Sequence, residues 1–188
     1  MRIGILGGSF DPVHLGHLAL AEAARDQLAL DRVLLVVAAG QPLKPSGPVA
    51  PAEDRYAMLR LAVRGRERLE ASDMEFQRPA PSYTVDTLRE IRREAPPGAE
   101  VVLLLGADAL ADLPRWRESA AIRTLAKVAA CTRPGFPPPS GADLALEIDT
   151  PDISSTDVRR RVASGEGIGT LVPEDVAVYI TERGLYRA

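Results

Sequence analysis

RIGILGGSFDPVHLGH, residues 2–17, is the stretch of this 188-residue chain that decides its fold. It begins as an apolar strand, passes through the glycine pair Gly7 and Gly8, and ends in a tetrad that holds both histidines of the chain, His14 and His17. Residues three apart lie almost one turn apart on a helix, so both imidazoles can face the same point. Because glycines let a bulky ligand approach the backbone, this order predicts a phosphate site at the mouth of a parallel sheet.

The histidine pair is open to other interpretations. Two histidines at this spacing could be half of a metal site, but such sites take three or four protein ligands and the chain has no further histidine. Both imidazoles could also be structural. The one cysteine, Cys131, lies in an apolar run and is expected to be a buried strand residue. The glycine pair next to the histidines favours phosphate binding.

Apolar runs alternate with stretches of helical spacing along the rest of the chain. Continuous apolar runs suit parallel strands that are covered by helices on both faces. Strands are expected at 1–8, 31–40, 67–79 (one strand or a pair), 100–108, 126–135 and 144–149, and helices at about 15–28, 52–64, 82–96, 153–165 and 171–184, with a short helix around Trp116. A serine or threonine should cap the helix at 82–96. The alternation predicts a doubly wound, mostly parallel α/β sheet, whose ligands bind beyond the carboxyl ends of the strands.

Composition narrows the classes of function. The net charge of -3 argues against broad nucleic-acid binding, which depends on neutralising phosphates. No apolar run reaches the length of a membrane span, and no signal peptide is expected at the N-terminus. A single cysteine excludes an internal disulfide and fits a reducing compartment. We expect a cytoplasmic protein without nucleic-acid or membrane partners, and the sequence leaves the oligomeric state open.

Motifs along the chain resemble a known family. The first stretch is neither a GxGxxG fingerprint nor a Walker A loop, but it resembles the first motif of the HxGH nucleotidyltransferases. ISSTDVRRR, residues 153–161, is similar to their second motif, ISSTxxR. The resemblance to bacterial nicotinate-mononucleotide adenylyltransferases then extends over nearly the whole chain, through PSYTVDTL (81–88), GADALADLPRWRE (106–118), the TRPG turn (132–135) and LVPEDVAVYITERGLYR (171–187).

The resemblance implies a fold and a reaction. The fold would be Rossmann-like, with one nucleotidyltransferase domain over residues 1–188 and a helical C-terminal part from about residue 153. ATP and nicotinate mononucleotide would give deamido-NAD and pyrophosphate by in-line phosphate attack, without a covalent intermediate. Mg²⁺ would arrive with ATP, and no metal-ligating residue of the protein is expected. The alternatives are a sibling transferase acting on nicotinamide mononucleotide, phosphopantetheine or glycerol phosphate, and a nucleotide binder that has lost catalysis.

The resemblance also implies catalytic roles. His17 would contact the α-phosphate, His14 would hold the departing phosphates, and Lys44 would close over the triphosphate. Arg159 would supply a forked cation to the β- and γ-phosphate oxygens. Many relatives carry PPHK in the loop of Lys44, where this chain reads QPLKP, with Leu43 at the histidine position. That departure puts the loop's histidine contribution in doubt, while the reaction class is unaffected.

Binding residues are assigned in the same way. The expected ATP contacts are Gly7, Gly8, Ser9, Phe10, Gly16, Gly106, Asp108, Ile153, Ser155 and Thr156. Ser155 and Thr156 fall at a helix start, where free N–H groups favour phosphate, although they could also be only a helix cap. Trp116 would stack on the pyridine ring, although a core role is the default for a tryptophan. Thr84, with the backbone of Tyr83, would meet the ring carboxylate and so disfavour the neutral amide.

Overall fold

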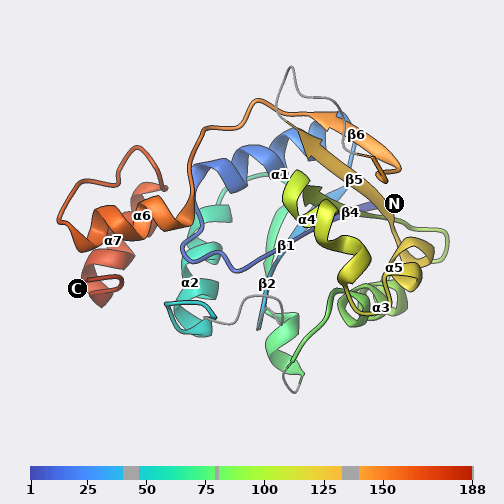
Figure 1. Ribbon diagram of the computed structural model, residues 1–188, viewed down its shortest axis with the longest axis horizontal. Helices are drawn as coiled ribbons and strands as arrows, with labels where there is room; N and C mark the ends of the chain where they lie inside the picture. Colours follow the sequence, from blue (N-terminus) through green and yellow to red (C-terminus); the bar gives the residue numbers. More distant parts are fainter. Residues whose placement is uncertain (40–46, 79–80, 133–139, 188) are drawn as a thin grey trace.

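A parallel sheet forms the centre of the molecule in the computed structural model, which describes residues 1–39, 47–78, 81–132 and 140–187 (Figure 1). Its strands are β1 (Arg2–Gly8), β2 (Arg32–Val37), β3 (Leu69–Ser72), β4 (Glu100–Gly106), β5 (Lys127–Thr132) and β6 (Leu144–Glu147). They lie in the order β3-β2-β1-β4-β5-β6, and every neighbouring pair is parallel. The order reverses between β1 and β4, so the doubly wound parallel sheet is confirmed.

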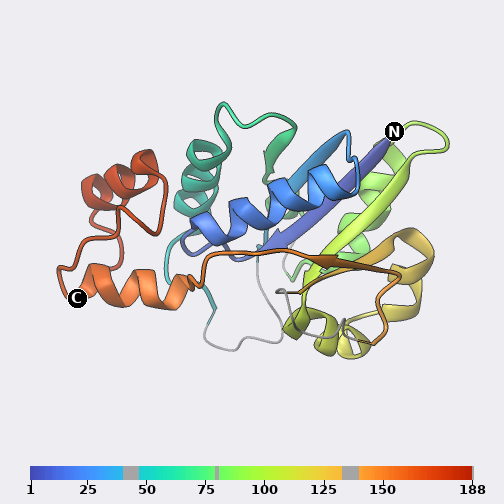
Figure 2. The same ribbon diagram turned by 90° about the horizontal axis from the view of Figure 1, so that it is seen from above.

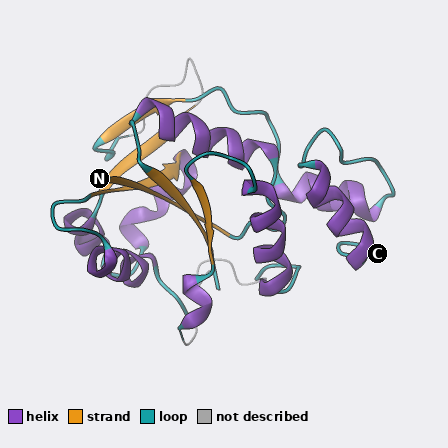
Figure 3. Ribbon diagram, turned by 180° about the vertical axis from the view of Figure 1, so that it is seen from behind, coloured by secondary structure: helices purple, strands orange, loops and turns teal. Residues whose placement is uncertain are grey.

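Helices cover both faces of this sheet (Figure 3). They are α1 (Leu15–Gln27), α2 (Ala52–Val63), α3 (Thr84–Glu94), α4 (Ala107–Asp112), α5 (Ser119–Leu125), α6 (Ser155–Ala163) and α7 (Glu174–Arg183), with two 3-10 turns, η1 (Met74–Gln77) and η2 (Leu113–Arg115). Alternate residues of a strand point to opposite faces. Leu35 accordingly joins an apolar core with α1, α2, α6 and α7, whereas Leu34 joins a second core with α3, α4 and α5.

The C-terminal helices α6 and α7 lie at one end of the molecule, beside α1 and α2 (Figure 2). Ser154 caps α6, because its hydroxyl accepts the N–H of Asp157 at 3.1 Å. Gly184 ends α7 in the left-handed region, with φ of +61°, where glycine carries no Cβ penalty. The backbone N–H of Leu15 donates to the carbonyl of Leu171 at 2.9 Å. The start of α1 is thereby tied to the C-terminal part.

Two local expectations are wrong. In the segment 67–79 only the first part is a strand, because Met74–Gln77 turns into η1 and buries the Glu75 side chain. The residue before α3 is Tyr83, and among the described residues no side chain caps that helix. The Ser82 hydroxyl instead accepts a hydrogen bond from Arg78 at 2.7 Å. Tertiary hydrogen bonds to these side chains have overridden the local pattern.

Candidate active site

A cavity of about 460 Å³ opens at the carboxyl ends of β1 and β4, where the strand order reverses. Its wall brings together the three residues expected at the mononucleotide and three of those expected at ATP: Tyr83, Thr84, Trp116, Gly7, Gly8 and Asp108. The lining is more apolar than polar, as is typical of a pocket for a flat ring with a few polar anchors. The structure therefore has a cavity at the edge of the sheet where the strand pattern predicted a ligand site.

Trp116 stands at one side of this cavity, directly after η2. Its backbone N–H donates to the carbonyl of Leu113 at 3.0 Å, and its half-buried ring packs against the core below. The guanidinium of Arg117 lies 4.7 Å above the ring of Tyr83, within the range of a cation–π contact. The indole is thus both a core contact and part of the cavity wall.

The first turn of α3 supplies the polar end of the cavity. Thr84 is the first helical residue and Tyr83 precedes it, so N–H groups that the helix leaves unpaired lie at the cavity. A helix start carries partial positive charge and favours a carboxylate or a phosphate. The arrangement can therefore accept an anionic substituent of a bound ring.

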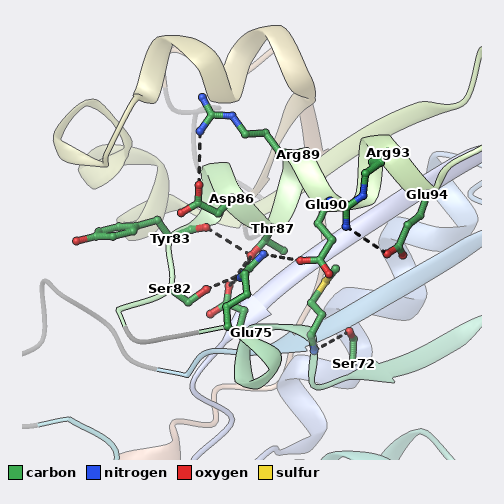
Figure 4. Close-up of polar contacts among 12 residues, drawn as sticks. Ser72, Glu75, Ser82, Tyr83, Asp86, Thr87, Arg89, Glu90, Arg93 and Glu94 are labelled. Atoms are coloured by element: carbon green, nitrogen blue, oxygen red, sulfur yellow. Dashed lines mark hydrogen bonds and ion pairs between the residues drawn. The ribbon is translucent and has the colours of Figure 1, made fainter.

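A network around Glu75 holds this helix start in place (Figure 4). The Glu75 carboxylate is buried and accepts the hydroxyl of Thr87 at 2.8 Å and the N–H of Ala39 at 3.2 Å. Arg78 donates to the hydroxyls of Ser82 and Thr87, each at 2.7 Å. Figure 4 shows Glu75, Ser82 and Thr87 converging beside the beginning of α3. Charge-assisted hydrogen bonds of this kind fix the orientation of the turn.

The two histidines lie face to face at the start of α1. Their ring centroids are 3.7 Å apart with 27° between the planes, and the N–H of His14 donates to Nδ1 of His17 at 3.2 Å. Burial lowers the pKa of His14 to about 4. Burial, and then the neighbouring His14, lower the pKa of His17 to about 3. Both imidazoles are neutral near pH 7, and because Nδ1 of His17 accepts, its proton resides on Nε2.

Glycine at position 16 gives the His14 ring its space. A Cβ there would lie 3.1 Å from Nδ1 of His14 and 3.3 Å from the carbonyl oxygen of Pro151, tighter than ordinary packing. Among the described residues, His14 Nδ1 is also buried without a hydrogen-bond partner. The sequence interpretation gave Gly16 to the nucleotide, and the structure adds that it makes room for the imidazole beside it.

Phe10 connects the histidines to the cavity. Its buried ring meets the edge of His17 at a centroid distance of 5.0 Å. The same ring would lie 3.1 Å from a Cβ built on Gly8, which lines the cavity. The cavity wall and the histidine pair are therefore neighbours across one aromatic side chain.

The second motif docks directly onto the first. The hydroxyl of Ser155 donates to the carbonyl of Pro12 at 2.9 Å. Arg159 donates to the carbonyl of Asp11 at 2.7 Å, 148 residues away in the chain, and to the hydroxyl of Thr156 at 3.2 Å. The two motifs, far apart in sequence, are thus brought together as the resemblance implied, with the start of α6 beside the start of α1.

The remaining expected residues are distributed around this centre. The carbonyl of Ser9 accepts a hydrogen bond from Arg55 at 2.7 Å. Gly106 precedes the first residue of α4, and Ile153 packs partly buried against the apolar core. Lys44 and Leu43 lie outside the described residues.

Sequence reasoning missed three buried charged residues: Asp11 and Arg55 beside the first motif, and Glu75 on the cavity wall. Arg55 is 2 % exposed and donates to the carbonyls of Ser9, Ala38 and Ala50, which joins the first motif to the residues around the end of β2. Asp11 stands inside the first motif, so its position was available as a signal. Nothing in the local pattern marks Glu75 as buried.

Neither a cluster of metal-ligating side chains nor a membrane-spanning helix is found in the described part of the chain. Within residues 1–39, 47–78, 81–132 and 140–187, no group of three or more His, Cys, Asp or Glu side chains could hold a metal ion. Over the same ranges, none of the helices has the length and apolar character needed to cross a bilayer.

Comparison with known proteins agrees with this geometry. A family model described as cytidylyltransferase-like matches residues 5–161. The chain is 49 % identical over 189 residues to a probable nicotinate-nucleotide adenylyltransferase of Thermus thermophilus, covering all of both chains. It is 48 % identical to another from a Roseiflexus species, covering 98 % of each.

Solved structures share the fold. A nicotinic acid mononucleotide adenylyltransferase of Plasmodium falciparum, complexed with NaAD, superposes with a TM-score of 0.78 at 19 % identity, covering 98 % of this chain and 97 % of that one. A putative nicotinate-nucleotide adenylyltransferase from Vibrio parahaemolyticus gives a TM-score of 0.73 at 22 % identity, covering 99 % and 95 %. At these identities the likeness establishes the fold.

Proposed function

The chain belongs to the cytidylyltransferase-like family and to the nicotinate-nucleotide adenylyltransferases, and on this premise we propose that it transfers the adenylyl group of ATP to nicotinate mononucleotide in NAD biosynthesis. The observation that carries the proposal is the contact between two sites. A cavity with an indole wall and a helix start for a carboxylate adjoins, across Phe10, a histidine pair and the start of α6. One site suits an acidic ring nucleotide and the other suits a triphosphate.

In the proposed reaction, a phosphate oxygen of the mononucleotide attacks the α-phosphorus of ATP. A new P–O bond forms, the bond from the α-phosphorus to the oxygen that bridges to the β-phosphorus breaks, and pyrophosphate leaves with that electron pair. The protein has to position two polyanions and offset their charge, and no covalent intermediate is needed.

The phosphate contacts are assigned to the two motifs. Nε2–H of His17 donates to an α-phosphate oxygen, because Nδ1 already accepts from the backbone. His14 holds the departing phosphates, and the triphosphate's charge raises the pKa of both imidazoles toward protonation. The free N–H groups at the start of α6 and the Arg159 guanidinium meet the β- and γ-oxygens. The role of Lys44 stays a prediction.

The mononucleotide contacts are assigned to the cavity. Trp116 stacks on the pyridine ring, and the N–H groups at Tyr83 and Thr84 receive its carboxylate. A neutral amide places an N–H₂ donor where the helix start already presents donors, so the acid is preferred. Asp108, at the start of α4, stands on the cavity wall where the ATP ribose can reach it.

Magnesium is proposed to enter with ATP. The buried carboxylate of the first motif, Asp11, already accepts the N–H groups of Val49 and Ala50, so its oxygens do not fit a metal-binding role, and the triphosphate and water would supply the ligands. When bound, the ion offsets triphosphate charge. We also propose a cytoplasmic location, which the single buried thiol of Cys131 supports.

The test is pyrophosphate release from ATP and Mg²⁺, run in parallel with nicotinate mononucleotide and nicotinamide mononucleotide. Release with the acid and little with the amide is expected. Release with the amide alone would keep the transfer chemistry and overturn the assignment of the helix start. No release with either, together with ATP binding by calorimetry, would leave a sibling substrate or a nucleotide-binding protein as the better account.

A further inference from the structure

Tyr186, close to the C-terminus, makes an unexpected contact with the first motif. It follows α7 and Gly184, and it is 9 % exposed. Its hydroxyl donates to Oδ1 of Asp11 at 2.8 Å, across 175 residues of chain. Its φ of +62° lies in the left-handed region that residues other than glycine rarely adopt. A backbone held in this region indicates that the surrounding contacts fix the side chain in place.

Asp11 is the meeting point of four segments. Besides the Tyr186 hydroxyl, its carboxylate accepts the N–H groups of Val49 at 2.7 Å and Ala50 at 3.0 Å. The Arg159 guanidinium lies 3.8 Å from Oδ2. The carboxylate is 4 % exposed, so these donors replace water as its hydrogen-bond partners. Burial and the neighbouring Asp11 raise the pKa of Tyr186, which keeps its hydroxyl protonated as the donor.

The position of Asp11 links this cluster to the phosphate site. Its own carbonyl accepts the hydrogen bond from Arg159, and the chain runs directly from it to His14. A shift of Asp11 would therefore move the guanidinium and the imidazoles relative to one another. The Tyr186 hydroxyl limits that shift by holding the carboxylate from the side of the C-terminal segment.

We propose that Tyr186 and Asp11 are positioning residues, which fix the distance between Arg159 and the histidine pair for adenylyl transfer. The inference rests on the proposed function. It predicts that loss of the Tyr186 hydroxyl lowers the turnover number while the cavity still binds the mononucleotide, since misplacing a charge-stabilising group costs rate more than binding.

The chain offers a matched control in Tyr179. Its hydroxyl donates to Oδ1 of Asp54 at 2.8 Å, and Asp54 is about as buried as Asp11, at 5 % exposure. This bond also ties the C-terminal part to the rest of the chain, but its partners stand on α7 and α2, outside both motifs. Removing one hydroxyl at each position compares two bonds of the same kind.

The experiment measures kcat and KM of Tyr186→Phe and Tyr179→Phe for both substrates, with Tm for each variant, at a temperature where both are folded. Tyr186→Phe should lower kcat about tenfold and leave the KM for nicotinate mononucleotide within about twofold, whereas Tyr179→Phe should match the wild type. Equal kcat values in the two variants, or losses that follow the loss of Tm in both, would overturn the proposal. Activity of wild type and Tyr179→Phe shows separately that the proposed function holds.

Discussion

The site has a cavity side, lined by Tyr83, Thr84 and Trp116, and a phosphate side, formed by the histidine pair and the start of α6. Both sides are held by the same kind of contact, but over different lengths of chain. Each depends on a buried carboxylate that accepts backbone N–H groups from the chain after β2: Glu75 accepts from Ala39, and Asp11 accepts from Val49 and Ala50. The two carboxylates differ in where their other partners come from.

Glu75 is satisfied locally. It meets Arg78, three residues on at 4.0 Å, and Thr87, twelve residues on, so the helix start at the cavity is held by neighbours in sequence. Asp11 meets Arg159 and Tyr186, which belong to the C-terminal part. We infer that the cavity keeps its shape independently of α6 and α7, whereas the phosphate side depends on how they dock. Predictions that separate substrate binding from turnover test this difference.

The largest effect is expected for His17→Ala. Removing the Nε2–H donor from the α-phosphate should lower kcat by about 10²- to 10⁴-fold, the range for one lost charge-stabilising or proton-handling group. The KM for nicotinate mononucleotide should change little, because the cavity lies on the far side of Phe10. Steady-state pyrophosphate release measures both constants. His17→Asn can still accept the N–H of His14, so it controls for disruption of the first turn of α1. Near-wild-type turnover in either variant would show that His17 takes no part in the reaction.

An effect of intermediate size is expected on stability. The two buried histidines of the phosphate side should make the free energy of unfolding depend on pH. The folded pKa values, about 4 for His14 and about 3 for His17, lie below the unfolded value of 6.5. At a pH between the folded and unfolded pKa values, the unfolded chain binds more protons than the folded protein. The free energy of unfolding therefore falls as the pH falls below 6.5, and the full stability is retained above pH 6.5. The loss should be on the order of 1 kcal/mol per histidine and pH unit.

Urea unfolding of the ligand-free protein between pH 7.5 and 4.5 measures this dependence. Carboxylates elsewhere titrate in the same range, so the double variant His14→Asn/His17→Asn serves as the reference. The wild type should lose stability more steeply than the double variant. Parallel curves would mean that the imidazoles titrate normally in the folded state and are not held neutral by burial.

How much of this architecture can be predicted from sequence depends on how far apart in the chain the contacting residues lie. The run of apolar residues into Gly7 and Gly8, and the three-residue spacing of the histidines, act within one strand and one helical turn. Such local patterns predicted the edge of the sheet at which the cavity lies. The similarity of residues 153–161 to a known motif then indicated that Arg159 would act together with the first motif. No residue spacing in the chain could show this by itself.

The parts that sequence missed depend on contacts between distant segments. The bond from Tyr186 to Asp11 closes across nearly the whole chain, and a lone tyrosine near the C-terminus carries no periodic signal. The segment around Glu75 is expected to be extended, but the Glu75 carboxylate accepts the hydroxyl of Thr87 and the backbone turns into η1. Gly16 is expected to leave room for the nucleotide; that it also leaves room for the His14 imidazole is visible only in three dimensions.

The smallest of the three effects belongs to the cavity side, in Trp116→Ala. Stacking of a base on an aromatic side chain contributes about 1–3 kcal/mol, so losing the indole should raise the KM for nicotinate mononucleotide roughly tenfold or more, with little change in the KM for ATP. Trp116→Phe keeps a ring on the same wall and should recover most of the affinity. Because Trp116 also packs against the core, Tm has to be followed in both variants. If the KM for ATP rose as much as that for the mononucleotide, the two sides would not be independent.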